Sequence, residues 1–262
     1  MKGVARGVDA SLDLEDLTHE IQPFDIWQGA YRLYQTAPYW PAGTVFVSVV
    51  DPGVGTPRKS IVARSRAGHY YVTPDNGTLT LIADEIGIEA VRWIDEAKLR
   101  LPGSHTSNTF HGRDVYSYVG ALLASRQLTF EATGLALSPN DLERIPYQTA
   151  TQVTRTDGIW HLGTIPILDP NFGNVWSNIR TDQLADIKWG SILHIRILQG
   201  EREVWSGHVP YLETFGKAKP ASPLAYPNSL GNLSLALNQA NFATTHQISS
   251  GPTWHIEVHP TP

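Results

Sequence analysis

The chain has 262 residues, carries a formal net charge of −5 at neutral pH and contains no cysteine. This length suits one or two domains and can bury a hydrophobic core without disulfides. The lack of cysteine excludes thiolate catalysis, iron–sulfur clusters and cysteine-ligated zinc. The acidic balance argues against nucleic acid or a membrane as a partner. No signal-like or membrane-length apolar stretch is present, so we expect a soluble, cytoplasmic protein.

The first 150 residues alternate between helical and strand patterns. Apolar residues at helical spacing predict a helix over 25–39. The nearly continuous apolar run over 44–50 is typical of a strand covered on both faces. Such alternation predicts an α/β N-terminal domain, residues 1–150, with a largely parallel central sheet. The remaining elements are expected as strands over 60–64 and 70–73 and helices over 78–86 and 115–125.

From residue 151 the pattern changes to short strands separated by Gly, Asp and Asn turns. We expect a smaller, mostly-β C-terminal domain over 151–262, after a polar, proline-containing boundary at 146–156. The one helix expected in this half covers 233–243, and a final alternating strand covers 254–258. The strands before that helix are expected over 159–167, 191–198 and 203–209.

The segment 49–60 directly follows the buried strand, where open α/β sheets commonly bind ligands. Gly53 with Lys59-Ser60 suggests a phosphate-binding loop, but Pro57 removes a needed backbone N–H and a strand follows instead of a helix. Two interpretations remain equally open. The loop is either a ligand site or a tight turn capped by Asp51.

The segment Thr109-Phe110-His111-Gly112-Arg113-Asp114 leads into the helix expected at 115. Its structural interpretation is a helix N-cap at Asp114 beside a surface histidine. Its functional interpretation combines His111 with Asp and Arg side chains from another loop to activate a water molecule.

Two further segments, 169–178 and 226–232, lie in the β-rich half. Both have the composition of turns. Asn174 beside Phe172 and Trp176 also suits a purine base, which needs hydrogen bonds and stacking together. No zinc-protease helix, nucleophile elbow or dinucleotide fingerprint occurs, so we predict no metal and no redox cofactor.

Taken in order, these segments resemble one family, the S-adenosyl-L-methionine (SAM) hydroxide adenosyltransferases, which are SAM hydrolases related to the fluorinase and chlorinase. The resemblance implies an α/β N-terminal domain, a small β C-terminal domain and a homotrimer with sites between subunits. The motifs that carry it are Leu17 to Ile26, Val50 to Thr56, Pro74 to Gly77, Thr109 to Asp114, Asp169 to Asn178 and Asn228-Ser229.

The family resemblance assigns catalysis to Asp51, Arg58 and His111, the residues that match its water-activating set. In the related halogenases the position of Asp51 is typically a tyrosine. A carboxylate there repels a halide but can orient water, so the chain resembles the hydrolase branch. The expected reaction is attack of water or hydroxide on C5′ of the ribose, with SAM as the substrate and adenosine and methionine as the products.

The same resemblance implies a set of substrate contacts. It places Phe24 along the ribose and Phe215 against the adenine, and it gives Ser229 the methionine carboxylate. The residues that match contacts around the adenine and the methionine end are Asp169, Phe172 and Asn174, with Trp176 nearby.

The opening residues Met1-Lys2-Gly3-Val4 resemble the family segment that follows its first strand and a ribose-binding carboxylate. The alternative to a hydrolase is therefore a protein that binds SAM or adenosine with little or no turnover. A halogenase is a third hypothesis, against which Asp51 and His111 argue.

Overall fold

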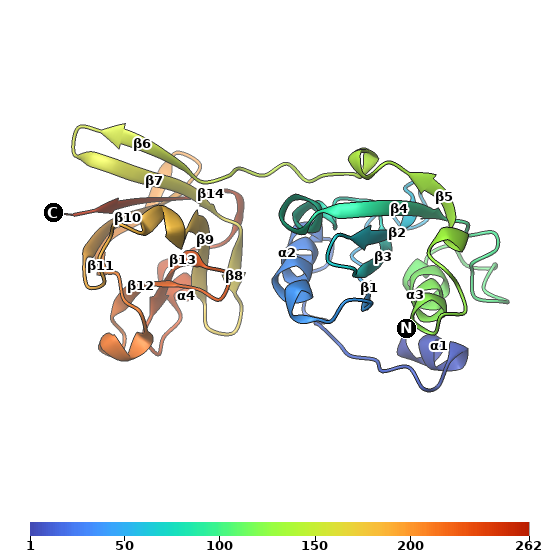
Figure 1. Cartoon of the computed structure of the whole chain (residues 1–262). Helices are drawn as coiled ribbons and strands as arrows, with labels where there is room; N and C mark the ends of the chain where they lie inside the picture. The colour runs from blue at the N-terminus through green and yellow to red at the C-terminus, as the bar shows by residue number, and fades with distance from the viewer. Residues whose placement is uncertain (262) are drawn as a thin grey trace. The chain divides into compact units, whose positions relative to one another are not determined.

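The computed structural model describes residues 1–261 and divides into two compact units, Met1–Ile145 and a second unit that begins at Pro146 (Figure 1). The predicted combination of an α/β part with a smaller mostly-β part is confirmed. None of the described helices is long and apolar enough to cross a membrane.

The first unit is built on a five-stranded sheet with the order β1-β3-β2-β4-β5. Among its described strands, only β1 and β3 pair in parallel, so the expectation of a largely parallel sheet is wrong. The turn at 66–69 joins β2 directly to β3, and so short a connection permits only antiparallel pairing. The strands are β1 (Val45–Val47), β2 (Ser60–Ser65), β3 (Tyr70–Pro74), β4 (Ile88–Ile94) and β5 (Gly134–Leu137).

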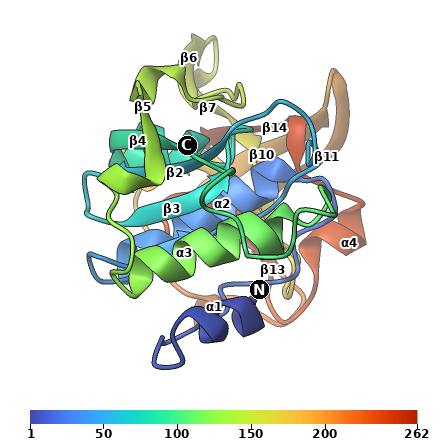
Figure 2. The ribbon, with the colours of Figure 1, turned by 90° about the vertical axis from the view of Figure 1, so that its right-hand side faces the viewer.

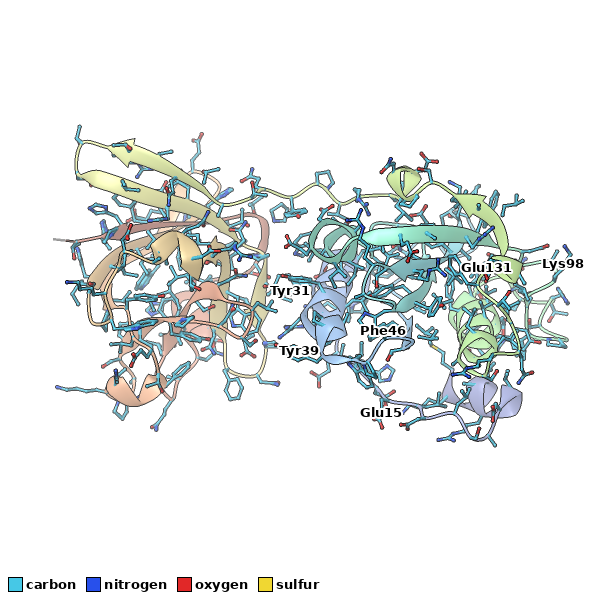
Figure 3. All side chains as sticks on the ribbon, in the orientation of Figure 1. Glu15, Tyr31, Tyr39, Phe46, Lys98 and Glu131 are labelled. Atoms are coloured by element: carbon cyan, nitrogen blue, oxygen red, sulfur yellow. The ribbon has the colours of Figure 1, made fainter. Side chains whose placement is uncertain are left out.

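Two helices, α2 (Ile26–Thr36) and α3 (Ser117–Ala124), cover opposite faces of this sheet (Figures 1 and 2). Under α2, the rings of Phe46 and Tyr71 stack with centroids 5.3 Å apart. Figure 3 shows Phe46 in the sheet and Tyr31 on α2. Strands β2 and β3 are therefore buried on both faces. In the run over 44–50, which is expected to be covered on both faces, only Phe46 is buried and the other residues are half-buried.

Shorter elements complete the first unit. Helix α1 (Lys2–Val8) lies against α3 (Figure 2). The helix expected over 78–86 begins at Thr80 and continues as η2 (Ile82–Ile86). The one expected from 115 begins earlier, as η3 (Gly112–Tyr116), which continues into α3. The remaining turns are η1 (Ala37–Tyr39), η4 (Glu131–Thr133) and η5 (Pro139–Asp141).

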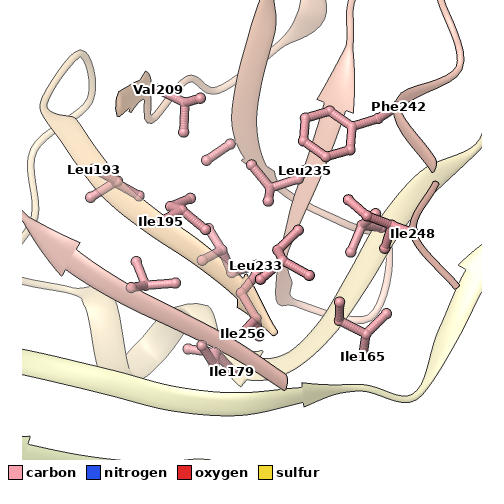
Figure 4. Packing of buried hydrophobic residues seen from close by; sticks show 14 of the residues in the cluster. Ile165, Ile179, Leu193, Ile195, Val209, Leu233, Leu235, Phe242, Ile248 and Ile256 are labelled. Carbon is pink, nitrogen blue, oxygen red and sulfur yellow. The ribbon is translucent and has the colours of Figure 1, made fainter. Parts of the chain in front are cut away.

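The second unit consists of two antiparallel sheets, with the orders β11-β10-β14-β7-β6 and β12-β13-β9-β8. Apolar side chains of both sheets, among them Ile195, Leu235 and Ile256, form one core (Figure 4). The elements are β6 (Thr151–Arg155), β7 (Gly158–Ile165), β8 (Ile167–Asp169), β9 (Asn174–Arg180), η6 (Thr181–Leu184), β10 (Ile192–Gln199), β11 (Arg202–Pro210), η7 (Phe215–Lys217), β12 (Pro223–Pro227), β13 (Asn232–Leu237), α4 (Phe242–His246) and β14 (Gly251–Pro260).

The helix expected over 233–243 is wrong. Residues 232–237 form strand β13, and only α4 is helical in that region. Strand β13 lies between β12 and β9 and is buried on both faces from Leu233 to Leu237. Leu233, Leu235 and Leu237 alternate with Ser234 and Ala236, a period of two that fits a strand, and pairing with β12 and β9 stabilises that strand on both sides.

Gly120 of α3 faces β1 so closely that an added Cβ would lie 2.6 Å from Cγ2 of Val47, whereas a Cβ at Gly7 of α1 meets nothing within 4 Å. We predict that Gly7→Ala raises the free energy of unfolding by about 0.5–1 kcal/mol through helix propensity. Gly120→Ala lowers it by about 1–3 kcal/mol through overpacking. Urea denaturation measures both. Equal stabilisation by the two substitutions contradicts the packing of α3 on the sheet.

Candidate active site

The first group of candidate residues lies at one edge of the sheet in the first unit. Asp51 follows the end of β1, Arg58 precedes β2 and His111 precedes η3, while Glu96 follows the end of β4. The loop that carries Asp51 is fixed by the Asn76 amide, which donates to the Val50 carbonyl at 2.9 Å. This edge, where β1, β3 and β4 end, is where α/β sheets commonly place their sites.

Asp51 and Arg58 form a bidentate ion pair. Arg58 Nε donates to Asp51 Oδ1 at 2.8 Å and Nη2 donates to Oδ2 at 2.5 Å. Their side chains are only 7% and 10% exposed, respectively. The carboxylate therefore binds Arg58 and does not cap the turn, while the backbone carbonyl of Asp51 accepts from Val54 N at 3.3 Å. Burial opposes the charge of Arg58, but the bond to Asp51 helps to hold its pKa above the ordinary value.

The same guanidinium contacts His111, whose Nδ1 lies 3.0 Å from Arg58 Nη2. Arginine stays protonated and can only donate, so Nδ1 must accept. This bond assigns His111 as the neutral imidazole with its proton on Nε2. Burial lowers the pKa of His111 below its ordinary value, and the charges of Arg58 and Arg100 lower it further against the opposing effect of Glu96 and Asp51.

Ser60 connects this group to two residues from other elements. Its hydroxyl lies 2.9 Å from Arg58 Nη1, 2.6 Å from Glu96 Oε1 and 3.0 Å from the Tyr116 hydroxyl. A carboxylate can only accept, so the single Ser60 proton goes to Glu96. Arg58 and Tyr116 must then both donate to Ser60 Oγ. Glu96 also lies 4.0 Å from His111 Nδ1.

This cluster can hold a polar nucleophile. It combines an ionised pair, an imidazole that is neutral and carries its proton on Nε2, and a second carboxylate, Glu96, 3.7 Å from Arg100 Nη1. A carboxylate accepts hydrogen bonds from water, and Nε2–H donates one to an oxygen. The prediction that Asp114 is a helix N-cap is wrong, because Asp114 is fully buried inside η3 and paired with Arg113.

The second group of candidate residues lies in the second unit, around Tyr226. Burial raises the pKa of Tyr226 to about 12, against the opposing effect of the neighbouring Trp176, Ser234 and Asn174 side chains. The Phe215 ring lies over it with centroids 4.7 Å apart. Tyr226 thus brings together three of the predicted substrate residues, Asn174, Trp176 and Phe215.

Turns present the remaining candidates of this unit. Ser229 is exposed on a turn held by Asn228, whose Oδ1 accepts from Leu230 N at 2.9 Å and from Asn232 N at 3.1 Å. At the other turn Asp169 pairs with Asn174 in the β8–β9 ladder, and Phe172 is 66% exposed.

Phe24 lies in the first unit, in the loop before α2, and no described contact joins it to the Asp51 cluster. Its side chain is 78% exposed, and its backbone has a left-handed φ of 72°. This conformation costs free energy in a residue other than glycine, and strained residues of this kind are concentrated at functional sites.

Two protein-family domains match the chain. Residues 1–134 match the N-terminal domain of the SAM hydroxide adenosyltransferases, and residues 163–255 match their C-terminal domain. The chain belongs to the SAM hydroxide adenosyltransferase family.

Curated relatives and a solved structure agree with this family. A protein of Methanocaldococcus jannaschii named (R)-S-adenosyl-L-methionine hydrolase is 49% identical over 70% of this chain, and the match spans 59% of that protein. One of the same name from Salinispora arenicola is 36% identical over 90% of this chain and 83% of its own length. An uncharacterised conserved protein from Thermotoga maritima has a TM-score of 0.85 at 31% identity, covering 98% of this chain and 92% of that one.

Four residues of the two groups are not predicted by the sequence patterns. Ser60 and Tyr226 lie inside the segments 49–60 and 226–232, but nothing in those segments indicates a role for their hydroxyls. Glu96 carried a usable signal, because it follows β4 as Asp51 follows β1, and strands ending at one edge bring such side chains together. No sequence signal indicates a role for Tyr116 in the site, because its position in the helix predicts only core packing.

We predict that Asp51→Asn lowers the free energy of unfolding by about 3 kcal/mol, because it leaves the Arg58 guanidinium buried without its counter-charge. The control is Asp182→Asn, which removes a carboxylate from an ion pair with Arg180 in which both side chains are 62% exposed. Urea denaturation should show no measurable change for that control. Equal effects of the two substitutions contradict the burial of the Asp51 pair.

Proposed function

We propose that this chain hydrolyses S-adenosyl-L-methionine to adenosine and L-methionine. The observation that carries the proposal is the buried Asp51–Arg58–His111 cluster in a member of this family. The names of the relatives add a refinement, since both specify the (R)-sulfonium epimer. We therefore propose that the (R)-epimer is a substrate of this chain.

The reaction is a displacement at C5′ of the ribose. The oxygen of water or hydroxide forms a bond to C5′ while the C5′–S bond breaks, and the sulfur keeps the electron pair. Methionine leaves as a neutral thioether and needs no general acid, and water releases one proton to its surroundings. The nucleophile is the partner that needs help, because water is weakly nucleophilic. Orientation and partial deprotonation can supply that help.

Each residue of the cluster has a distinct role in this proposal. Asp51 accepts a hydrogen bond from the attacking water, and His111 Nε2–H donates one to the same oxygen. Arg58 holds both side chains by its bonds to Asp51 and to His111 Nδ1. His111 acts as a donor because its other nitrogen is already occupied.

We propose that substrate binding uses the residues that the family resemblance assigns. The aromatic rings and the Asn174 amide gathered on Tyr226 suit a purine base, and the exposed Ser229 suits the methionine carboxylate. The proposed contacts are Phe24, Asp169, Phe172, Asn174, Trp176, Phe215 and Ser229. The proposal also includes a homotrimer with sites shared between subunits. It requires SAM as the substrate and no cofactor.

The test is chromatography of the protein incubated separately with the (R)- and (S)-epimers of SAM. We predict adenosine from the wild-type protein and a loss of kcat of about 10²–10⁴-fold in Asp51→Asn and in His111→Ala. Asp182 is exposed and has no role in the proposed reaction, so Asp182→Asn should keep the wild-type rate.

Two outcomes contradict the proposal. Tight binding of SAM in titration calorimetry without adenosine release favours a binding protein. A 5′-halo product that appears with added chloride and displaces adenosine favours a halogenase.

A further inference from the structure

The Ser60 hydroxyl is the feature of the site that no assigned role explains. It is fully buried and lies at the meeting point of Arg58, Glu96 and Tyr116, which come from three different parts of the first unit. Its one proton and two lone pairs are all used, so it fixes the direction of every hydrogen bond around it.

We propose that Ser60, Tyr116 and Glu96 are positioning residues of this site, which hold the Arg58 guanidinium so that one of its N–H groups always points at His111 Nδ1. The inference rests on the proposed hydrolysis and adds residues to the same site.

The Arg58 guanidinium is held on two sides. Its Nε and Nη2 bind Asp51, which fixes one side of the guanidinium fork. The bond from Nη1 to Ser60 fixes the opposite side, and the Tyr116 ring lies 5.6 Å from the Arg58 carbon Cζ. With both sides held, the second N–H of Nη2 has one direction left, toward His111. A planar group held at several points is already oriented, so little orientational freedom remains to be lost in the reaction.

The charges around His111 affect its protonation. Two carboxylates, Asp51 and Glu96, and two guanidiniums, Arg58 and Arg100, face His111, and the neutral Tyr116 ring lies beside it with centroids 6.5 Å apart. Glu96 Oε1 lies 4.0 Å from His111 Nδ1, and of the two carboxylates Glu96 favours the protonated imidazole more strongly. Replacing its charge with a neutral amide therefore lowers the pKa of His111 further.

Glu96→Gln separates charge from geometry, because the amide oxygen can still accept from Ser60. The active form has neutral His111, so activity falls on the acid side of the pH profile as that imidazole gains a proton. We predict that Glu96→Gln moves this acid limb to lower pH while the variant stays folded, since the Glu96 side chain is already 29% exposed. An acid limb that stays in place or moves to higher pH overturns the role of Glu96.

Ser60→Ala and Tyr116→Phe remove the geometric restraint. We predict that each lowers kcat by about 10- to 100-fold with KM nearly unchanged, because a misplaced catalytic group slows the chemical step. The matched controls are Ser65→Ala and Tyr71→Phe, which remove equally buried hydroxyls from β2 and β3. Losses no larger than in these controls overturn the role of Ser60 and Tyr116.

A spectroscopic readout keeps this inference separate from the proposed function. In protein labelled with ¹⁵N-histidine, the His111 signals are assigned by their loss in His111→Gln. We predict an unprotonated Nδ1 and a protonated Nε2 in the wild type, and a mixture of tautomers in Ser60→Ala. A wild-type His111 protonated at Nδ1 overturns the inference. Absence of adenosine from the wild type overturns the proposed hydrolysis, and the tautomer measurement still decides the positioning.

Discussion

The buried guanidinium of Arg58 is the constraint on which the site depends. A charge with so little exposure is tolerated only when counter-charges and hydrogen bonds surround it. Asp51 supplies the counter-charge, and His111 and Ser60 supply the remaining acceptors. Because arginine only donates, satisfying it also determines the protonation of its neighbours. The need to stabilise one cation thus fixes the state of the imidazole that the proposed chemistry uses.

The sheet makes this arrangement possible. Asp51 and Glu96 follow strands that end at the same edge as the start of β2, which carries Ser60 and follows Arg58. Helices α2 and α3 cover both faces, so the strands cannot shift without disturbing two cores. The close approach of Gly120 to Val47 ties the helix that follows His111 to the strand that precedes Asp51. A rigid support of this kind holds catalytic groups more closely than loops alone can.

The parts predictable from sequence were those encoded locally. The Asp51, Arg58 and His111 motifs and the apolar run that contains β1 are short, and the structure brings the three side chains together. The relative direction of the strands is not encoded locally, because it depends on which strands pair. The short connection between β2 and β3 imposes antiparallel pairing on those two strands. The leucines of β13 alternate as in a strand, and the helix prediction missed this because Ala236 and the residues that follow, up to Ala243, extend the apolar pattern. Glu96 and Tyr116 meet Ser60 across 36 and 56 residues of chain. The position of Glu96 after β4 indicates the first contact only once the strand pairing is known, and no local pattern indicates the second.

The most direct test of the central role of Arg58 is the rate of adenosine release by Arg58→Lys compared with Arg58→Ala. Lysine keeps the positive charge but lacks the planar fork that joins Asp51, His111 and Ser60. If the geometry of the fork is what matters, kcat of the lysine variant falls nearly as far as that of the alanine variant. A lysine variant that retains the wild-type kcat contradicts this account, because charge alone would then suffice.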